Sequence, residues 1–260
     1  MKTSFKAKKK FGQNFLINEE LCIQISKLEK IKSKNILEVG PGNMALTNNI
    51  IKAKPKKFFA LEIDSDLINK YPDKILSKYI INEDALKIDE LNLFNKEKFR
   101  IISNLPFNIS SELLIKWLKV QNNFNCIESM TLMFQKELAE RLTAKHNSKK
   151  YGRITILSGA FFNIEKKIYV DKENFNPEPK VDAQVLQFTP HKINKIRQED
   201  FSKLEKITFD FFNERRKKNI KKIKKIFNKK KIIKNILDKY FSLRPENLDK
   251  DVYYNLARIL

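Results

Sequence analysis

The sequence predicts an α/β fold: a parallel, doubly wound sheet, followed by a small all-helical domain at the C-terminal end. Four short apolar runs predict buried strands at residues 35–39, 57–61, 78–81 and 99–102. Patterns with helical spacing separate these runs, and after the fourth run Ser110 is positioned to cap a helix. Strands that alternate with helices are typical of a parallel sheet with helices on both faces.

Each of the four predicted strands leads into a residue that is able to contact a ligand, namely Gly40, Glu62, Asp84 or Asn104. In a doubly wound sheet the ligand crevice lies outside the carboxyl ends of the parallel strands. Four such strand ends in succession are hard to obtain by chance. We therefore expect these residues to gather around one bound ligand.

The rest of the chain divides into a β-rich segment and a helical one. Residues 127–134 and 181–188 have strand character, and the rigid, proline-rich loop 175–181 lies between them. Beyond this segment the apolar residues recur at helical spacing. We therefore expect an α/β domain over residues 1–189 and a basic helical domain over residues 190–260.

The chain is strongly basic, because 53 Lys and Arg residues against 31 Asp and Glu residues give its 260 residues a net charge of +22. More than half of this excess lies in residues 190–260, and residues 215–225 are the densest stretch. A polyanion is the expected partner, since neutralising phosphates releases counterions. Two alternatives stay open. An AT-rich genome would raise the lysine content without any function, and a membrane surface also attracts basic patches, although no amphipathic anchor is evident.

Other bulk properties disfavour several classes of protein. No apolar run approaches the roughly 18 residues of a membrane span, and the basic N-terminus lacks the apolar stretch of a secretory signal, so a cytoplasmic location is expected. Cys22 and Cys126 are expected to be buried thiols, because neither belongs to a Cys-x-x-Cys pair; a disulfide or a zinc site is disfavoured. Two histidines leave little room for histidine-based catalysis.

The first candidate binding motif is Glu38-Val-Gly-Pro-Gly42, directly after the first predicted strand. Its glycines allow a tight turn and the close approach of a ligand to the backbone. A dinucleotide fingerprint wants a third glycine, but that position holds Ala45, and the bulky Met44 precedes it. A nucleoside ligand without phosphates therefore fits better than a pyrophosphate.

Two carboxylates are candidates for holding such a nucleoside. Glu62 follows the second strand and is placed to accept hydrogen bonds from both ribose hydroxyls. Its alternative role is that of a solvated carboxylate at a strand end. Asp84 follows the third strand and is placed to accept from an adenine amino group, while the next backbone N–H donates to the ring. The alternative for Asp84 is a helix or turn cap.

The most specific motif is Asn104-Leu-Pro-Phe107, after the fourth strand. The exocyclic amine of adenine is a poor nucleophile, because its lone pair is delocalised into the ring. An asparagine oxygen and a backbone carbonyl can accept its two hydrogens, which draws the nitrogen toward a tetrahedral shape and exposes the lone pair. Pro106 makes the turn rigid, and Phe107 offers a face on which a base stacks. The alternative is a strand-to-helix turn with a buried phenylalanine.

With these motifs in place, the chain resembles the small-subunit ribosomal RNA adenine dimethyltransferases, the KsgA type, from about residue 8 to about residue 258. The matching segments are Phe11-Gly-Gln-Asn-Phe-Leu16, Glu38-Val-Gly-Pro-Gly42 with Ala45-Leu-Thr47, Asn104-Leu-Pro-Phe-Asn-Ile-Ser110, Gln135-Lys-Glu137, Tyr151-Gly-Arg153 and Phe175-Asn-Pro-Glu-Pro-Lys-Val-Asp182. Phe212-Asn-Glu-Arg-Arg-Lys217 resembles the basic motif of the family's C-terminal domain.

This resemblance implies a Rossmann-like class I methyltransferase domain that uses S-adenosylmethionine, with a small helical RNA-binding domain. Enzymes of this family transfer four methyl groups, two to the N6 amine of each of two adjacent adenines, in a hairpin near the 3' end of small-subunit RNA. They also act as a checkpoint in ribosome assembly. The implied partner is ribosomal RNA within a small-subunit particle, and a monomer is expected.

Roles for the cofactor-binding positions are also implied by the resemblance. Asn14 and Leu16 would close over the cofactor, and Gly40 would approach it. Glu62 would hold its ribose and Asp84 its adenine.

The target adenine has its own implied set of residues. Asn104, which also lies against the cofactor, and the Pro106 carbonyl would bind the target amine. Phe107 would stack on the base, and Phe175 would lie on the other face of the base. Arg215 and Arg216 would contact the RNA.

Two positions depart from the family pattern. Phe107 is more often tyrosine; stacking survives that change and a hydroxyl contact is lost, so activity is still expected. Met44 stands where a small residue is usual, and we expect it to narrow the cofactor site and weaken affinity while the backbone contacts remain.

Three alternatives are weighed against this assignment. The large-subunit RNA methylases that confer macrolide resistance share the fold and the Asn-x-Pro-aromatic turn. The segments at 151–153 and 179–182, with the basic Arg215-Arg216 motif, resemble the small-subunit family more. An assembly factor that binds RNA without catalysis would not need Asn104, Glu62 or Asp84. A nicotinamide oxidoreductase is disfavoured by the missing third glycine and by the basic charge.

Overall fold

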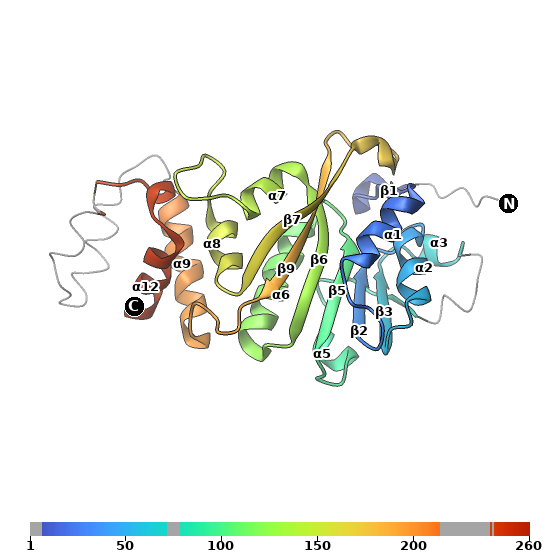
Figure 1. Ribbon diagram of the computed structural model, residues 1–260, viewed down its shortest axis with the longest axis horizontal. Coiled ribbons are helices and arrows are strands. Elements are labelled where there is room, and N and C mark those ends of the chain that lie inside the picture. Colours follow the sequence, from blue (N-terminus) through green and yellow to red (C-terminus); the bar gives the residue numbers. More distant parts are fainter. Residues whose placement is uncertain (1–6, 72–78, 214–239, 241) are drawn as a thin grey trace. The chain divides into compact units, whose positions relative to one another are not determined.

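A computed structural model of the chain describes residues 7–71, 79–213, 240 and 242–260 (Figure 1). Contacts within the chain divide it into two units. One unit comprises the residues up to Ala139 together with Ile164–Pro190, and the other comprises Glu140–Asn163 together with the residues from His191 onward. The second unit thus contains a segment from the middle of the chain in addition to the C-terminal residues expected there.

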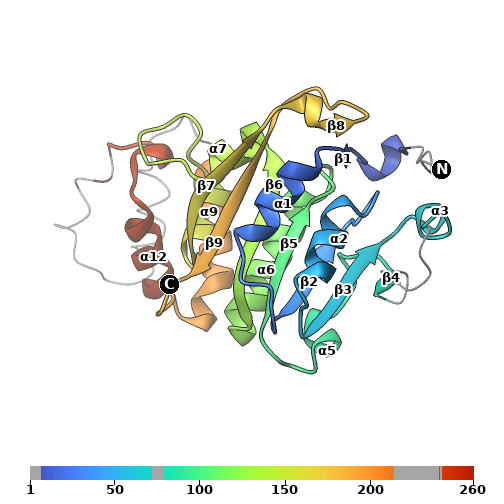
Figure 2. The same cartoon turned by 45° about the vertical axis from the view of Figure 1, so that its right-hand side comes forward.

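Seven strands form one mixed sheet, in the order β4-β3-β2-β5-β6-β9-β7 (Figures 1 and 2). They are β2 (Asn35–Val39), β3 (Lys57–Glu62), β4 (Ile80–Asn82), β5 (Phe99–Asn104), β6 (Ile127–Gln135), β7 (Phe162–Val170) and β9 (Ala183–Pro190). The strands from β4 to β6 pair in parallel, and β9 joins β6 antiparallel. All six strands predicted from the sequence are confirmed, with ends shifted by a few residues.

β7 has no counterpart among the predicted strands. Its central residues include Glu165, Lys166 and Lys167, and most of its residues are exposed. It is the last strand of the sheet, next to β9. Charged side chains on an edge strand disfavour pairing of its free side with another chain. Such a strand therefore has no buried apolar run by which the sequence would predict it.

Helices cover both faces of the parallel part of the sheet. On one face α1 (Glu19–Lys27) and α2 (Ala45–Lys52) pack over a core shared with residues of β2, β3 and β6. On the opposite face lies α6 (Ser110–Phe124), which is drawn behind the strands in Figure 2. The shorter helices of this unit are α3 (Ser65–Ile68) and α5 (Glu90–Leu93), and α7 (Lys136–Leu142) follows β6 directly.

The start of α6 differs from the expected one. Ile109 occupies the cap position, and Ser110 is the first helical residue. The Ser110 hydroxyl donates to the Phe107 carbonyl at 3.1 Å. Ser110 therefore stabilises the turn that precedes the helix and does not cap the helix N-terminus.

A separate two-stranded sheet joins two segments that are distant in sequence. β1 (Phe15–Leu16) pairs antiparallel with β8 (Phe175–Asn176), so that Leu16 lies opposite Phe175. The Ile17 N–H also donates to the Asn174 carbonyl at 2.9 Å. This pairing fixes the N-terminal residues beside the proline-rich loop.

The second unit is helical in its described residues. Its helices α8 (Arg153–Gly159), α9 (Phe201–Asn213) and α12 (Lys250–Ile259) pack together. The Phe211 and Tyr253 rings meet edge-on at 5.6 Å between centroids, and the Tyr254 hydroxyl donates to the Ile156 carbonyl at 3.0 Å. Buried aromatic rings and satisfied hydroxyls therefore hold this small helical domain together.

Both cysteines are free and buried, as expected. Burial raises the pKa of the Cys22 thiol to about 12 and that of the Cys126 thiol to about 11, so neither is a thiolate near neutral pH. Within the described residues, no helix combines the length and the apolar character that a membrane crossing requires.

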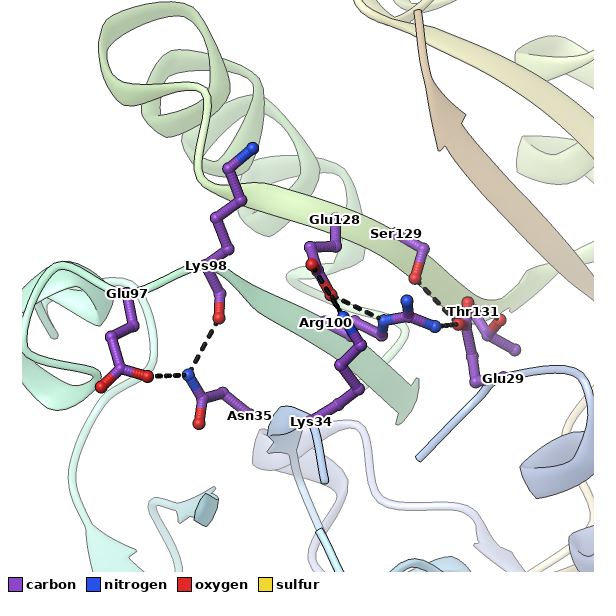
Figure 3. A network of polar contacts seen from close by, with 9 residues as sticks. All are labelled: Glu29, Lys34, Asn35, Glu97, Lys98, Arg100, Glu128, Ser129 and Thr131. Carbon is purple, nitrogen blue, oxygen red and sulfur yellow. Dashed lines mark hydrogen bonds and ion pairs between the residues drawn. The ribbon is translucent and has the colours of Figure 1, made fainter. Parts of the chain in front are cut away.

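A network of charges ties α1 to the amino-terminal edge of the sheet (Figure 3). The buried Glu29 carboxylate, just beyond α1, accepts from Arg100 at 3.1 Å and from the hydroxyls of Ser129 and Thr131 at 2.8 and 2.9 Å. Arg100 also donates to Glu128 at 3.0 Å. Every oxygen of Glu29 therefore has a partner, which a buried carboxylate requires.

Replacing Arg100 with alanine should lower the free energy of unfolding by about 3–5 kcal/mol, because it leaves the Glu29 charge buried without its cation. Urea unfolding followed by circular dichroism measures this loss. The matched control is Lys34→Ala, which removes the half-exposed partner of Glu128 and should cost about 1 kcal/mol or less. Equal losses in the two variants would contradict the assigned importance of the Arg100–Glu29 pair.

Candidate active site

A pocket opens at the carboxyl ends of β2, β3 and β5. Its lining comes from three strand ends and from the N-terminal residues that cross them. Among the residues selected from the sequence, those that line it are Asn14, Leu16, Gly40, Glu62, Asn104, Pro106 and Phe107. Parallel pairing of β2 with both neighbours brings these positions to one edge. Asp84 and Phe175 are not among the lining residues.

The glycine turn after β2 is built for close packing. Gly40 and Gly42 have φ values of +69° and +56°, which favour glycine. A Cβ added at Gly42 would lie 2.8 Å from the ring of Phe15, and one at Gly40 would lie 3.1 Å from Pro106. Side chains at either position would therefore push into the pocket lining.

Met44 also adopts a left-handed conformation, with φ +63°, but its side chain leaves the pocket. It is buried in a cluster with Phe15, Leu67 and Tyr71. The expectation that Met44 narrows the cofactor site is therefore wrong, because the side chain packs between the N-terminal residues and α3.

Glu62 is buried, which contradicts the alternative of a solvated strand-end carboxylate. One of its oxygens accepts from the Gly42 N–H at 3.3 Å and the other from the Asp64 N–H at 3.0 Å. Burial raises the pKa of this carboxyl group, and the two backbone bonds oppose that rise. Each carboxylate oxygen keeps a second lone pair for a ligand hydroxyl.

Glu38 lines the same pocket and was not selected from the sequence as a site residue. It is almost fully buried and accepts from the Thr47 hydroxyl at 2.8 Å. Burial raises the pKa of Glu38 to about 8, and the nearby Glu62 charge adds to the rise. Its place within the Glu38-to-Gly42 motif was the signal available in the sequence.

Asp84 lies at the end of β4, and its side chain is partly exposed. It accepts from the Leu86 N–H at 2.9 Å, as the turn-cap alternative predicts. A role of Asp84 toward adenine stays a prediction.

The two ends of the Asn104 side-chain amide have different surroundings. Its amide nitrogen donates to the Asn14 carbonyl at 3.2 Å. Its oxygen is buried and has no hydrogen-bond partner. Nearby, the Pro106 carbonyl accepts from the Ile109 N–H at 3.2 Å, which leaves one lone pair. A buried acceptor without a donor in a pocket indicates a place for a ligand N–H.

Phe107 and Phe175 contact each other edge-on, with centroids 6.1 Å apart and planes at 67°. Phe107 lines the pocket, whereas Phe175 is buried in β8 opposite Leu16. The two rings contact each other directly, and this geometry leaves no room for a base between them, so a base flanked by both rings stays a prediction. Arg215 and Arg216 lie outside the described residues.

Comparison with known proteins identifies the family. The ribosomal RNA adenine dimethylase family matches residues 4–255. The chain belongs to this family. A relative from Pelagibacter ubique named ribosomal RNA small subunit methyltransferase A is 41% identical, over 97% of this chain and 96% of the relative. One with the same name from a Wolbachia strain of Drosophila simulans is 35% identical, over 97% and 93% of the two chains.

Solved structures agree on the fold. A dimethyladenosine transferase from Plasmodium falciparum aligns with a TM-score of 0.72 at 26% identity, over 93% of this chain and 95% of that one. A 23S rRNA methyltransferase, ErmE, aligns with a TM-score of 0.67 at 19% identity, over 95% and 99% of the two chains, which shows the shared fold alone.

Membership in this dimethylase family implies S-adenosylmethionine as the methyl donor. The residues of the pocket fit a nucleoside of this kind. Glu62 offers buried carboxylate oxygens, the glycine turn lets a ligand approach the backbone, and Asn104 carries a buried oxygen without a partner. Glu62 would face the ribose, and Asn104 would face the reacting end of the cofactor.

The raised pKa of Glu38 predicts a pH dependence of stability. Between pH 4.5 and about pH 8 the folded protein holds a proton on Glu38 that the unfolded chain has released, so this contribution to stability falls as pH rises. Glu38→Gln should therefore lose less stability than the wild type over that interval. Urea unfolding at a series of pH values measures the difference, with the exposed Glu20→Gln as the control for the charge change. Parallel curves for wild type and Glu38→Gln would show that Glu38 is ionised in the folded protein.

Proposed function

We propose that this protein transfers methyl groups from S-adenosylmethionine to the N6 amines of two adjacent adenines in a hairpin near the 3' end of small-subunit ribosomal RNA. The observation that carries the proposal is the buried, unpartnered oxygen of Asn104, beside a glycine turn and a buried carboxylate. The names of the similar relatives support the small subunit as the substrate.

Asn104 and Pro106 act on the target amine. The Asn104 oxygen and the remaining lone pair of the Pro106 carbonyl accept the two N6 hydrogens. These bonds pull the amine out of the plane of the base and hold its lone pair in one direction. S-adenosylmethionine supplies an electrophilic methyl group. After transfer one N6 proton leaves to solvent, and no strong general base is required.

Aromatic rings hold the base itself. Phe107 lines the pocket and offers its face to the target adenine. Phe175 would take the other face, which requires the two rings to separate from their edge-on contact. The phenylalanine at position 107 has the stacking surface of the more usual tyrosine, so its missing hydroxyl does not prevent stacking.

Binding of a ribosomal particle rests on charge. The chain carries a net charge of +22, and phosphate neutralisation favours complexes with RNA. We assign Arg215 and Arg216 to phosphate contacts on the particle. A role in small-subunit assembly is compatible with catalysis, because recognition of the particle precedes methyl transfer.

Labelled S-adenosylmethionine offered to unmethylated small subunits, large subunits and naked RNA tests the function, with nucleoside mass analysis of the product. Dimethyladenosine is expected on small subunits only. Transfer to large-subunit RNA would favour a resistance-type methylase. Tight binding without transfer would indicate an assembly factor that has no catalytic role.

Asn104→Ala should reduce methyl transfer to small subunits by at least about a hundredfold, because it removes the oriented acceptor of the amine. Binding of the particle, measured by filter retention, should stay near the wild-type level. Near-normal turnover in this variant would remove Asn104 from the chemistry.

Charge reversal at Arg215 and Arg216 should weaken binding of the particle and flatten its dependence on salt. Each lost phosphate contact reduces the slope of log K against log salt by roughly 0.7–0.9. Binding titrations at a series of salt concentrations measure the slope. A slope equal to that of the wild type would place both arginines outside the interface.

A further inference from the structure

The N-terminal residues 8–16, which we call the N-terminal strap, cross the carboxyl ends of three strands. Its residues from Phe11 to Leu16 all line the pocket. In Figure 2 the strand β1, which ends the strap, lies next to β8 at the end of the sheet where the loops after β2 and β3 lie. The strap is therefore one wall of the proposed active site.

Asp64, which follows β3, holds the first half of the strap. Its side chain is almost fully buried. One carboxylate oxygen accepts from the Lys8 ammonium at 2.6 Å, and the other accepts from the Gln13 amide at 3.0 Å. The Lys8 N–H also donates to the Gln13 side-chain oxygen at 2.7 Å. These bonds close residues 8–13 into a loop with Asp64 at its centre, which we call the Asp64 latch.

The second half of the strap is seated on the glycine turn. Phe15 packs against Gly42, where any side chain would collide with its ring. Phe15 also belongs to the buried cluster that contains Met44. The Asn43 side chain donates to the Leu16 carbonyl at 2.8 Å. The middle of the strap, at Asn14, is thus fixed from both sides.

Fixing Asn14 has a chemical consequence. A side-chain amide has one end that donates and one that accepts, and a half-turn exchanges them. The Asn14 carbonyl accepts from the Asn104 nitrogen, so the Asn104 oxygen is the end left free. Only that end can accept a hydrogen from the target amine. The strap therefore determines whether Asn104 presents an acceptor or a donor.

We propose that Asp64 is a positioning residue for methyl transfer: through Lys8 and Gln13 it holds the strap so that the Asn14 carbonyl orients the Asn104 amide. The proposal rests on the proposed function, since it concerns the same reaction. Asp64 is not among the residues that line the pocket, so it acts through the strap.

Asp64 has a second, purely structural task, and the chain offers a control for it. It caps the four-residue helix α3 by accepting from the Asp66 N–H at 3.2 Å. Asp89 caps the four-residue helix α5 in the same way, by accepting from the Leu91 N–H at 3.0 Å. Asp89 lies outside the pocket lining. Asp89→Ala therefore reproduces the loss of a cap without loss of the latch.

The experiment compares Asp64→Ala with Asp89→Ala and the wild type, using the full-length chain and small subunits as substrate. The turnover number of Asp64→Ala should fall by roughly ten- to a hundredfold, because a small displacement of a reacting group has that effect. Asp89→Ala should stay within about twofold of the wild type, because surface changes away from a site rarely affect it. Equal turnover in the two variants would overturn the proposal, as would a raised KM for S-adenosylmethionine with unchanged turnover.

A second readout does not depend on methyl transfer. Trypsin cleavage after Lys8, Lys9 or Lys10, followed by mass spectrometry, reports opening of the strap. Cleavage should be several-fold faster in Asp64→Ala than in Asp89→Ala. Equal cleavage rates would refute the latch. If the wild type transfers no methyl group, the proposed function fails, and the cleavage rates still test the latch separately.

A further variant covers the case in which Asp64→Ala does not fold. Lys8→Met combined with Gln13→Leu removes both strap partners of Asp64 and leaves the cap of α3 in place. It should show the same loss of turnover, and cleavage after Lys9 and Lys10, the two sites that it keeps, should be faster than in the wild type. Wild-type turnover in this double variant would overturn the proposal.

Discussion

The direction of the Asn104 amide depends on one hydrogen bond, donated by its nitrogen to the Asn14 carbonyl. The oxygen at the other end is buried without a partner, a condition that costs about 1–3 kcal/mol in a protein interior. Such an unpartnered acceptor is expected in a binding site, where a ligand supplies the missing donor. The parallel sheet is what makes the arrangement possible, because pairing of β2 with β5 brings the glycine turn and Asn104 to the same edge.

Buried carboxylates at the amino and carboxyl ends of the strands, which we call the amino edge and the carboxyl edge of the sheet, have different partners. At the amino edge, the buried Glu29 carboxylate is paired with Arg100 and two hydroxyls, so its charge is fully compensated. At the carboxyl edge, Glu38 and Glu62 are buried and accept from a hydroxyl or from backbone N–H groups, and burial raises the pKa of both carboxyl groups. The buried charge of Glu29 is therefore paired with a cation, whereas Glu38 and Glu62 keep lone pairs that a ligand can use.

The central strands were predictable because burial on both faces leaves continuous apolar runs, as in β2. The strand ends then followed from the parallel arrangement, which located Glu62 and Asn104. The prediction that Met44 narrows the cofactor site was wrong, because the direction of a side chain depends on the backbone φ angle. With φ at +63°, the Met44 side chain points away from the pocket. The Asp64 latch joins residues more than fifty positions apart, and its bonds depend on tertiary contacts that no local pattern encodes. β7 carries charges at an edge and has no apolar run to mark it.

Stacking of a base between Phe107 and Phe175 requires the rings to separate, and the strap determines which ring can move. Phe175 is buried in β8, whose partner β1 is held in turn by the bond from Asn43 to the Leu16 carbonyl. Phe107 lies in the turn before α6, only partly buried and facing the pocket. A rotation of Phe107 breaks no backbone pairing, whereas a displacement of Phe175 breaks the β1–β8 ladder and pulls on the residues that orient Asn104. In the proposed function, Phe107 is therefore the ring that would move to make room for the base, while Phe175 and the strap would stay in place.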